Sequence, residues 1–184
     1  MNAMVKTFLK SREAQLVAVM LLMVAAIASR FPGFIAPGNL ASVFNDTSIL
    51  IILAFGQMAV ILTKCIDLSI AANLALCGMA AALLNVAFPD LSLAVILPLT
   101  ILLGAMLGSV NGLLVWKLDI PSIVVTLGTM TIYRGIIFLL TDGAWINAHE
   151  MSDAFKAFPR STLIGLPVLS WFAIATIAAI YLVY

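Results

Sequence analysis

Residues Gly104–Gly135, GAMLGSVNGLLVWKLDIPSIVVTLGTMTIYRG, decide the fold of this chain. They form two apolar segments that meet at a short polar break, KLDIP, at residues 117–121. Gly104, Gly108 and Gly112 recur every fourth residue, so on a helix they form a stripe where another helix can approach closely. Threonines and one arginine enter the second apolar segment. This combination is rare in water-soluble folds and predicts a transmembrane helical hairpin.

The composition of the whole chain agrees with this prediction. Of 184 residues, 64% are hydrophobic and only 9% are charged, against roughly 25% charged in an average soluble domain. Too few polar side chains remain to cover a water-soluble globule, so lipid must be the solvent for most of the surface. The net charge of +1 argues against nucleic acid as a partner. We expect an all-α, polytopic transmembrane helix bundle that forms one domain over residues 1–184.

The apolar runs predict about six spans. They are Ala14–Ser29, Ser48–Thr63, Leu68–Phe88, Leu91–Trp116, Ser122–Leu140 and Leu163–Tyr184. A cleaved signal peptide competes for the first run, but more hydrophobic sequence follows it instead of a soluble domain. Between the first two spans, Pro and Gly residues predict a loop with a short interfacial helix from Asn39. The last span reaches Tyr184 without a polar flank, which favours a chain that continues in a longer protein.

The distribution of Lys and Arg predicts the orientation, because cytoplasmic connections carry an excess of them. With residues 1–13 in the cytoplasm, the inner connections hold Lys6, Lys10, Arg12, Lys64 and Lys117, and the outer ones hold Arg30, Lys156 and Arg160. The long polar segment 141–162 is then an external loop. The asymmetry is modest and favours a cytoplasmic N-terminus.

Several kinds of chemistry find no support in the sequence. It contains no phosphate-binding loop of the G-x-x-x-x-G-K-S/T type, so we do not expect this chain to hydrolyse ATP. The single histidine, His149, has no second His or Cys at metal-ligand spacing and no triad partners. Cys65 and Cys77 form no CxxC pair and read as small apolar fillers. We therefore expect no metal, no cofactor and no enzyme activity.

Polar residues within the spans are the candidates for function. Asp67 precedes the third span, where its carboxylate can cap the helix or take part in coupling. Asn73 and Asn111 either bridge helices or meet the hydroxyl groups of a solute. Thr126 and Thr129 either line the same path or bond back to their own helix. We take the asparagines and threonines as a tentative substrate pathway.

Arg134 is a charge within the fifth span. An unpaired arginine in lipid costs roughly 2.5–3.5 kcal/mol on insertion scales, so its guanidinium needs protein, water or the interface. Snorkelling towards the outer interface and contact with the bundle interior both remain open.

A family resemblance rests on motifs spread in order along the chain. They are Asn39-Leu40, AFGQMAVILT at 54–63, IDLS at 66–69, NGLLV at 111–115, IVVTLGTM at 123–130 and Arg134-Gly135. Together these segments resemble the permease subunits of bacterial monosaccharide ABC importers, in the branch that carries ribose, autoinducer 2 and rhamnose. KCIDLSIAAN at 64–73 and WKLDIP at 116–121 look most like rhamnose-type permeases.

The resemblance implies an importer subunit in the bacterial inner membrane that passes a neutral monosaccharide, and rhamnose is the first candidate substrate. It also implies three partners: an ATP-binding cassette subunit, a periplasmic sugar-binding protein and a second permease subunit. Family members are longer, so this chain looks like the N-terminal part, without the helix that docks on the ATPase. A non-transporting membrane scaffold or regulatory subunit is the alternative.

The sequence departs from the family pattern at one informative place. Where the family reads Gly-Gly before IDLS, this chain has Lys64-Cys65. Because side chains disfavour positive φ, we expect any sharp backbone break here to be made in a different way.

Overall fold

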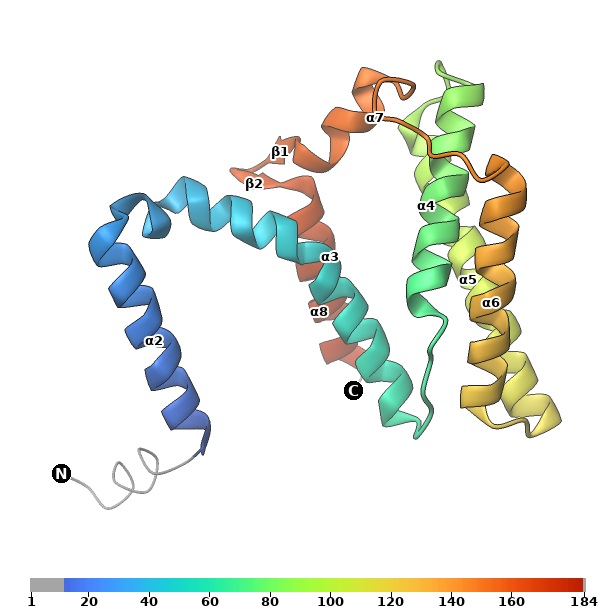
Figure 1. Ribbon diagram of the computed structural model, residues 1–184, viewed down its shortest axis with the longest axis horizontal. Helices are drawn as coiled ribbons and strands as arrows, with labels where there is room; N and C mark the ends of the chain where they lie inside the picture. Colours follow the sequence, from blue (N-terminus) through green and yellow to red (C-terminus); the bar gives the residue numbers. More distant parts are fainter. Residues whose placement is uncertain (1–11, 184) are drawn as a thin grey trace. The chain divides into compact units, whose positions relative to one another are not determined.

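The computed structural model describes residues 12–183, which are helical along most of their length (Figure 1). Five helices in this range are long and apolar enough to cross a bilayer, which confirms the predicted all-α polytopic class. The chain divides into two compact units, Met1–Asp46 and Thr47–Tyr184. Most of the predicted cytoplasmic segment 1–13 lies outside the described residues, and the single domain over 1–184 stays a prediction.

The first unit begins with α2, Arg12–Arg30, which contains the first predicted span. Glu13 lies in its first turn and Arg30 in its last, so both charges complement the helix dipole. The short 3₁₀ helix η1, Pro32–Ile35, leads to α3, Pro37–Leu62. The separate interfacial helix expected from Asn39 is wrong, because one continuous helix includes this segment and the second span. Pro37 suits the first helical position. Residues 39–55 contain no Gly or Pro, so nothing in them interrupts the helix.

The end of α3 carries the predicted backbone break. Lys64 adopts a left-handed conformation with φ of 62°. Its N–H donates to the Ile61 carbonyl at 2.8 Å, and the Cys65 N–H donates to the Val60 carbonyl at 3.3 Å. This pair of bonds is a Schellman motif, which usually places glycine at the left-handed position. The expectation of a different kind of break is therefore wrong: lysine adopts the conformation that glycine favours.

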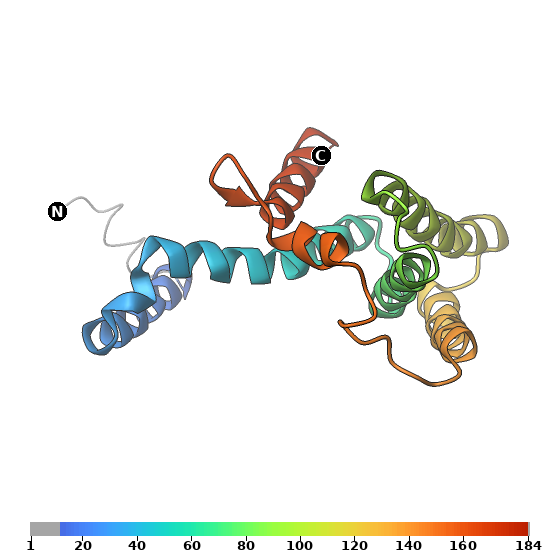
Figure 2. The same ribbon diagram turned by 90° about the horizontal axis from the view of Figure 1, so that it is seen from above.

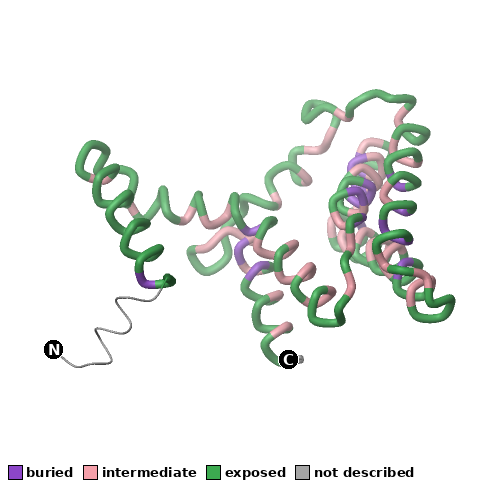
Figure 3. The backbone as a smooth tube through the Cα atoms, turned by 60° about the horizontal axis from the view of Figure 1, so that its bottom comes forward, coloured by how far each residue is buried: buried purple, intermediate pink, exposed green. Residues whose placement is uncertain are grey.

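Three helices of the second unit pack side by side: α4 (Ile70–Ala87), α5 (Leu93–Leu118) and α6 (Ser122–Thr141). Figure 2 views them nearly end-on, and Figure 3 shows buried positions concentrated along them. Ala72, Leu76 and Tyr133 form the buried apolar cluster between α4 and α6. The Tyr133 hydroxyl donates to the Leu107 carbonyl at 2.8 Å, which ties α6 to α5.

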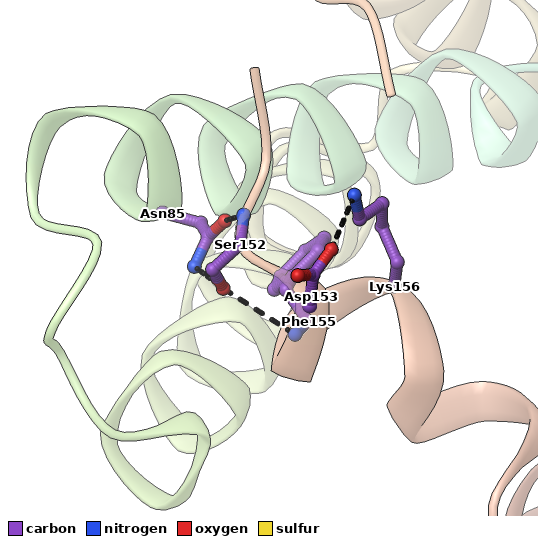
Figure 4. A network of polar contacts seen from close by, with 5 residues as sticks. All are labelled: Asn85, Ser152, Asp153, Phe155 and Lys156. Atoms are coloured by element: carbon purple, nitrogen blue, oxygen red, sulfur yellow. Dashed lines mark hydrogen bonds and ion pairs between the residues drawn. The ribbon is translucent and has the colours of Figure 1, made fainter. Parts of the chain in front are cut away.

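The connection after α6 folds back onto α4. It contains α7 (Asp153–Ala157) and the 3₁₀ helix η2 (Phe158–Arg160). The buried Asn85 side chain binds Ser152 twice, donating to its hydroxyl at 2.9 Å and accepting from its N–H at 2.8 Å (Figure 4). The Ser152 hydroxyl in turn caps α7 by accepting from the Phe155 N–H. An ion pair of 2.8 Å joins Asp153 to Lys156 and lowers the pKa of the Asp153 carboxyl.

The last described helix, α8, is Val168–Val183. A small antiparallel hairpin, β1 (Thr162–Leu163) and β2 (Leu166–Pro167), precedes it. The sixth span was expected to begin at Leu163, and this start is wrong by five residues. The two turn residues, Ile164 and Gly165, have φ of 52° and 79°, so the chain reverses before the helix can begin.

Candidate functional site

A non-helical segment, residues 64–69, joins α3 to α4 and lies against α5 and α6. The Ile66 N–H donates to the Ser122 hydroxyl at 3.1 Å, and the Thr126 hydroxyl donates to the Ile66 carbonyl at 3.3 Å. Both side chains belong to the first two turns of α6. Backbone groups outside helices are costly in a membrane unless protein or water satisfies them. The start of α6 therefore supplies the partners that hold this segment in an extended form.

The same segment is joined to α5 through a polar network. The Asp67 carboxylate accepts from both the N–H and the hydroxyl of Ser69, each at 2.7 Å. The Asn111 amide donates to the Ser69 hydroxyl at 2.8 Å. Ser69 is fully buried, and Asn111 is only 6% exposed. Ser69, not Asp67, is the residue that immediately precedes α4, so the carboxylate acts on a turn before the helix and not on its first turn.

One atom of this network has no partner. The Asn111 side-chain oxygen is buried and accepts no hydrogen bond from the described residues. An unsatisfied buried acceptor costs about 1–3 kcal/mol, so we expect this atom to meet a donor that residues 12–183 do not supply.

A pocket of about 440 Å³ opens beside this network. Its lining comes from the end of α3, the segment 64–69, the last turns of α5 and the first turns of α6, with Val60, Thr63, Cys65, Ile66, Asp67, Gly108, Asn111, Gly112, Val115, Trp116, Ser122 and Thr126. A carboxylate, an amide, several hydroxyls and an indole thus share one cavity. Neutral hydroxylated solutes suit such a wall, because hydroxyls both donate and accept while an indole presents an apolar face.

The structure brings together only part of the predicted pathway. Of that pathway, Asn111 and Thr126 line this pocket, together with Asp67, which was predicted as a helix cap or a coupling residue. Asn73 lies elsewhere, in a second groove of about 320 Å³ between α4 and α5, where its amide donates weakly to the Gly104 carbonyl at 3.4 Å. Thr129 is buried and bonds back to carbonyls of its own helix.

The three glycines of the predicted stripe have different neighbours among the described residues, and their role in packing stays a prediction. At Gly104, a Cβ atom would lie 3.4 Å from the Cys77 sulfur, so α4 approaches α5 closely there. At Gly108 and Gly112, a Cβ atom would meet nothing within 4 Å. Both of these glycines line the pocket instead. Among the described residues, a close helix contact is therefore seen at Gly104 alone.

Ser122 and Trp116 of the pocket lining, and the buried Ser69 of the adjoining network, were not chosen as site residues from the sequence. Ser69 lay within a quoted motif, Ser122 directly follows Pro121, and Trp116 adjoins the polar break. Their position next to a break between spans was the available signal, because residues there can face both a helix and a loop. Within residues 12–183, no group of three His, Cys, Asp or Glu side chains is placed to hold a metal ion.

The fold and the pocket define a class: a multi-span helical membrane protein with a mainly apolar cavity that holds a few polar side chains, beside the non-helical connection 64–69. A family model described as "Branched-chain amino acid transport system / permease component" matches residues 39–184. The chain belongs to this family of permease components.

The curated relatives are more specific. The chain is 35% identical to the autoinducer 2 import system permease protein LsrC of Klebsiella pneumoniae subsp. pneumoniae, over 95% of this chain and 49% of that protein. It is 37% identical to LsrC of Escherichia coli (strain K12 / DH10B), over 95% of this chain and 50% of that protein. It is 40% identical to LsrC of Photorhabdus luminescens, over 74% of this chain and 40% of that protein. No solved structure matches the chain.

Two consequences follow from these relatives. The chain spans about half the length of the curated relatives it matches. The particular similarity to rhamnose-type permeases is not supported, because these relatives are named for autoinducer 2 import.

Proposed function

We infer that this chain forms part of the transmembrane subunit of an ABC importer that carries a small, neutral, hydroxylated solute across the bacterial inner membrane. The family and the apolar helices support a multi-pass permease component. The single observation that carries the solute class is the pocket in which Asp67, Asn111, Thr126 and Trp116 meet. Autoinducer 2, the cargo in the names of the relatives, is the first solute to test.

The pocket chemistry fits a solute that must be released as well as bound. The Asn111 side-chain oxygen accepts no hydrogen bond from residues 12–183, so a solute hydroxyl that donates to it satisfies a buried acceptor. The Asp67 carboxylate is already engaged with Ser69 and adds a negative potential without requiring a cation. Hydroxyl groups of Ser122 and Thr126 offer further exchangeable bonds. Individually weak bonds of this kind select hydroxylated molecules without trapping them.

The segment 64–69 is a suitable moving part for alternating access. Three side-chain hydrogen bonds from α5 and α6 hold it: those of Asn111, Ser122 and Thr126. Non-helical backbone that lines a cavity often contributes to the solute path of transporters, and segment 64–69 lines the pocket beside the start of α4. With the predicted orientation, Lys64 and Lys117 place this end of the helices at the cytoplasmic side, so the pocket lies on the exit half of the path. An ATP-binding subunit, a periplasmic binding protein and a second permease subunit are the partners that this function requires.

A matched pair of threonines tests the proposal. Thr126 and Thr129 are both buried on α6, but only Thr126 lines the pocket. Solute binding is measured with the 184-residue chain in lipid nanodiscs, by quenching of Trp116 fluorescence in a background where both other tryptophans are phenylalanine. Losing one hydrogen bond weakens affinity roughly two- to tenfold, so Thr126→Val should weaken autoinducer 2 binding by this factor. Thr129→Val should change it by less than about twofold.

A second variant separates solute contact from folding. Asn111→Leu removes the unsatisfied oxygen along with the Ser69 bond, so stability should change by only about 1 kcal/mol, while solute binding falls. Equal binding by the parent, Thr126→Val and Asn111→Leu would show that the pocket does not hold this solute.

A further inference from the structure

A second hollow lies at the opposite end of α6, away from the solute pocket. It has a volume of about 190 Å³ and is lined by Met79, Arg134, Ile137, Phe138, Thr141, Gly143, Ala144 and Trp145. The transport function proposed above does not use it. Two of its side chains, Arg134 and Trp145, carry hydrogen-bond donors and no acceptors.

The chain is built to bring Trp145 back over the last turn of α6. Asp142 and Gly143 adopt left-handed conformations, with φ of 50° and 74°. A Cβ atom on Gly143 would lie 2.8 Å from Phe138 Cε2, so a side chain here would displace the Phe138 ring as well as strain the left-handed backbone. The Ala144 N–H then donates to the Thr141 carbonyl at 2.8 Å, which fixes the start of the connection. The hollow is therefore a defined feature of the backbone and not a gap between loose side chains.

Neither donor finds an acceptor among the described residues. The one ion pair among the described residues joins Asp153 to Lys156, so Arg134 pairs with no carboxylate there. The Trp145 indole N–H also donates to no described acceptor, and the side chain is 84% exposed. An arginine on an apolar helix without a counter-charge needs an anion or water. The hollow thus presents two hydrogen-bond donors without described partners, and a ligand with several hydrogen-bond acceptors would suit it.

The depth of Arg134 in the membrane identifies the source of such a ligand. Arg134 lies seven residues before the end of α6 at Thr141, which is roughly 10 Å along a helix. An arginine at that depth extends its side chain to the interface, where phospholipid phosphates lie. Tryptophan is enriched at the same level. Ile137 and Phe138 line the same hollow and offer apolar contact for the first carbons of acyl chains.

We propose that Arg134 and Trp145 form a binding site for the phosphate of a membrane phospholipid in the leaflet at this end of the bundle. The guanidinium donates two parallel N–H bonds to phosphate oxygens, and the indole N–H donates a third. A phosphate suits this site better than a carboxylate side chain, because the membrane supplies phosphates at this depth at high local concentration. The bound lipid neutralises the only arginine in the interior of the five described spanning helices.

The test measures lipid retained by the purified 184-residue chain in native mass spectrometry. Dioleoyl phosphatidylglycerol is the probe, and dioleoylglycerol, which lacks the phosphate, is the matched control lipid. Arg134→Gln should lower phosphatidylglycerol occupancy by roughly tenfold or more, because a charge-assisted bond pair is lost. Arg134→Lys keeps the positive charge but cannot donate two parallel N–H bonds, so it should retain an intermediate amount of phosphatidylglycerol. Arg160→Gln removes an exposed arginine from η2 and should retain as much lipid as the parent.

A second variant covers the case in which Arg134→Gln does not fold. Trp145→Phe keeps an aromatic ring at a largely exposed position and removes only the N–H, so the fold should persist while occupancy falls two- to tenfold. Equal retention of phosphatidylglycerol by the parent and Trp145→Phe, or equal retention of the two lipids by the parent, overturns the proposal. Displacement of the lipid by excess inorganic phosphate also overturns it, since the site would then belong to a free anion.

Discussion

Replacing Lys64 with glycine should stabilise the chain, although it removes the side chain altogether. Lys64 ends α3 in a left-handed conformation with φ of 62°. For an L-residue this conformation costs roughly 1–2 kcal/mol, and glycine avoids that cost. Glycine also has more freedom in the unfolded chain, which offsets roughly 0.5–1 kcal/mol of the gain. Lys64→Gly should therefore raise the free energy of unfolding by about 0.5–1 kcal/mol.

Lys117 provides a matched control on the same predicted side of the membrane. It lies inside the last turn of α5 in a helical conformation. Glycine in a helix interior is roughly 0.5–1 kcal/mol less favourable than lysine or alanine, so Lys117→Gly should destabilise by that amount. Both changes delete one positive charge from an inner connection, so any effect through charge alone is the same in the two variants. Lys64→Gly should therefore be more stable than the parent and Lys117→Gly less stable, and the free energies of unfolding of the two variants should differ by about 1–2 kcal/mol.

Reversible unfolding in mixed micelles, titrated with sodium dodecyl sulfate and followed by circular dichroism, measures the difference. The parent, Lys64→Gly and Lys117→Gly are compared under one set of lipid conditions. If both variants lose stability to the same extent, the left-handed conformation at Lys64 does not carry the expected cost and the reasoning fails.

Three further predictions test the packing, the orientation and the external connection. Gly104→Leu should destabilise the bundle by about 1–3 kcal/mol through overpacking against α4. Gly108→Leu places its side chain in the pocket, so it should leave the free energy of unfolding unchanged and weaken solute binding. Equal destabilisation by the two variants would contradict the packing assigned to these glycines. Cys65 lines the pocket and should react with a membrane-impermeant thiol reagent from the cytoplasmic side of inverted vesicles, and ready labelling from outside intact cells would overturn the orientation. The hydrogen bond from the Asn147 N–H lowers the pKa of the exposed Glu150 carboxyl. The bond therefore holds this turn together at pH values above the carboxyl's unfolded pKa. It is lost as the pH falls through the lowered pKa of the folded state. Hydrogen-exchange protection at Asn147 should fall over that range in the parent and be low throughout in Glu150→Gln; a pH-independent protection would refute the bond's role.

The sequence by itself determined the solvent and the class of this protein. Its apolar runs are long enough to require lipid, and backbone groups in lipid must be satisfied within helices, so the spans could be located without knowing their neighbours. The boundaries were less certain where a single residue overrides the general pattern. The chain turns at Ile164 and Gly165 before α8, and α3 continues through Asn39 because no residue there interrupts it.

The membership of the pocket was decided only by the tertiary structure. Periodicity shows which face of a helix is polar, but it does not show which helix or loop that face meets. Thr126 and Thr129 look alike in the sequence, yet only Thr126 reaches the Ile66 carbonyl. Asp67 and Asn111 are brought together through Ser69 because the segment between α3 and α4 is extended and lies along α5. Contacts between residues this far apart in the chain depend on how the helices pack, and local sequence carries little information about that packing.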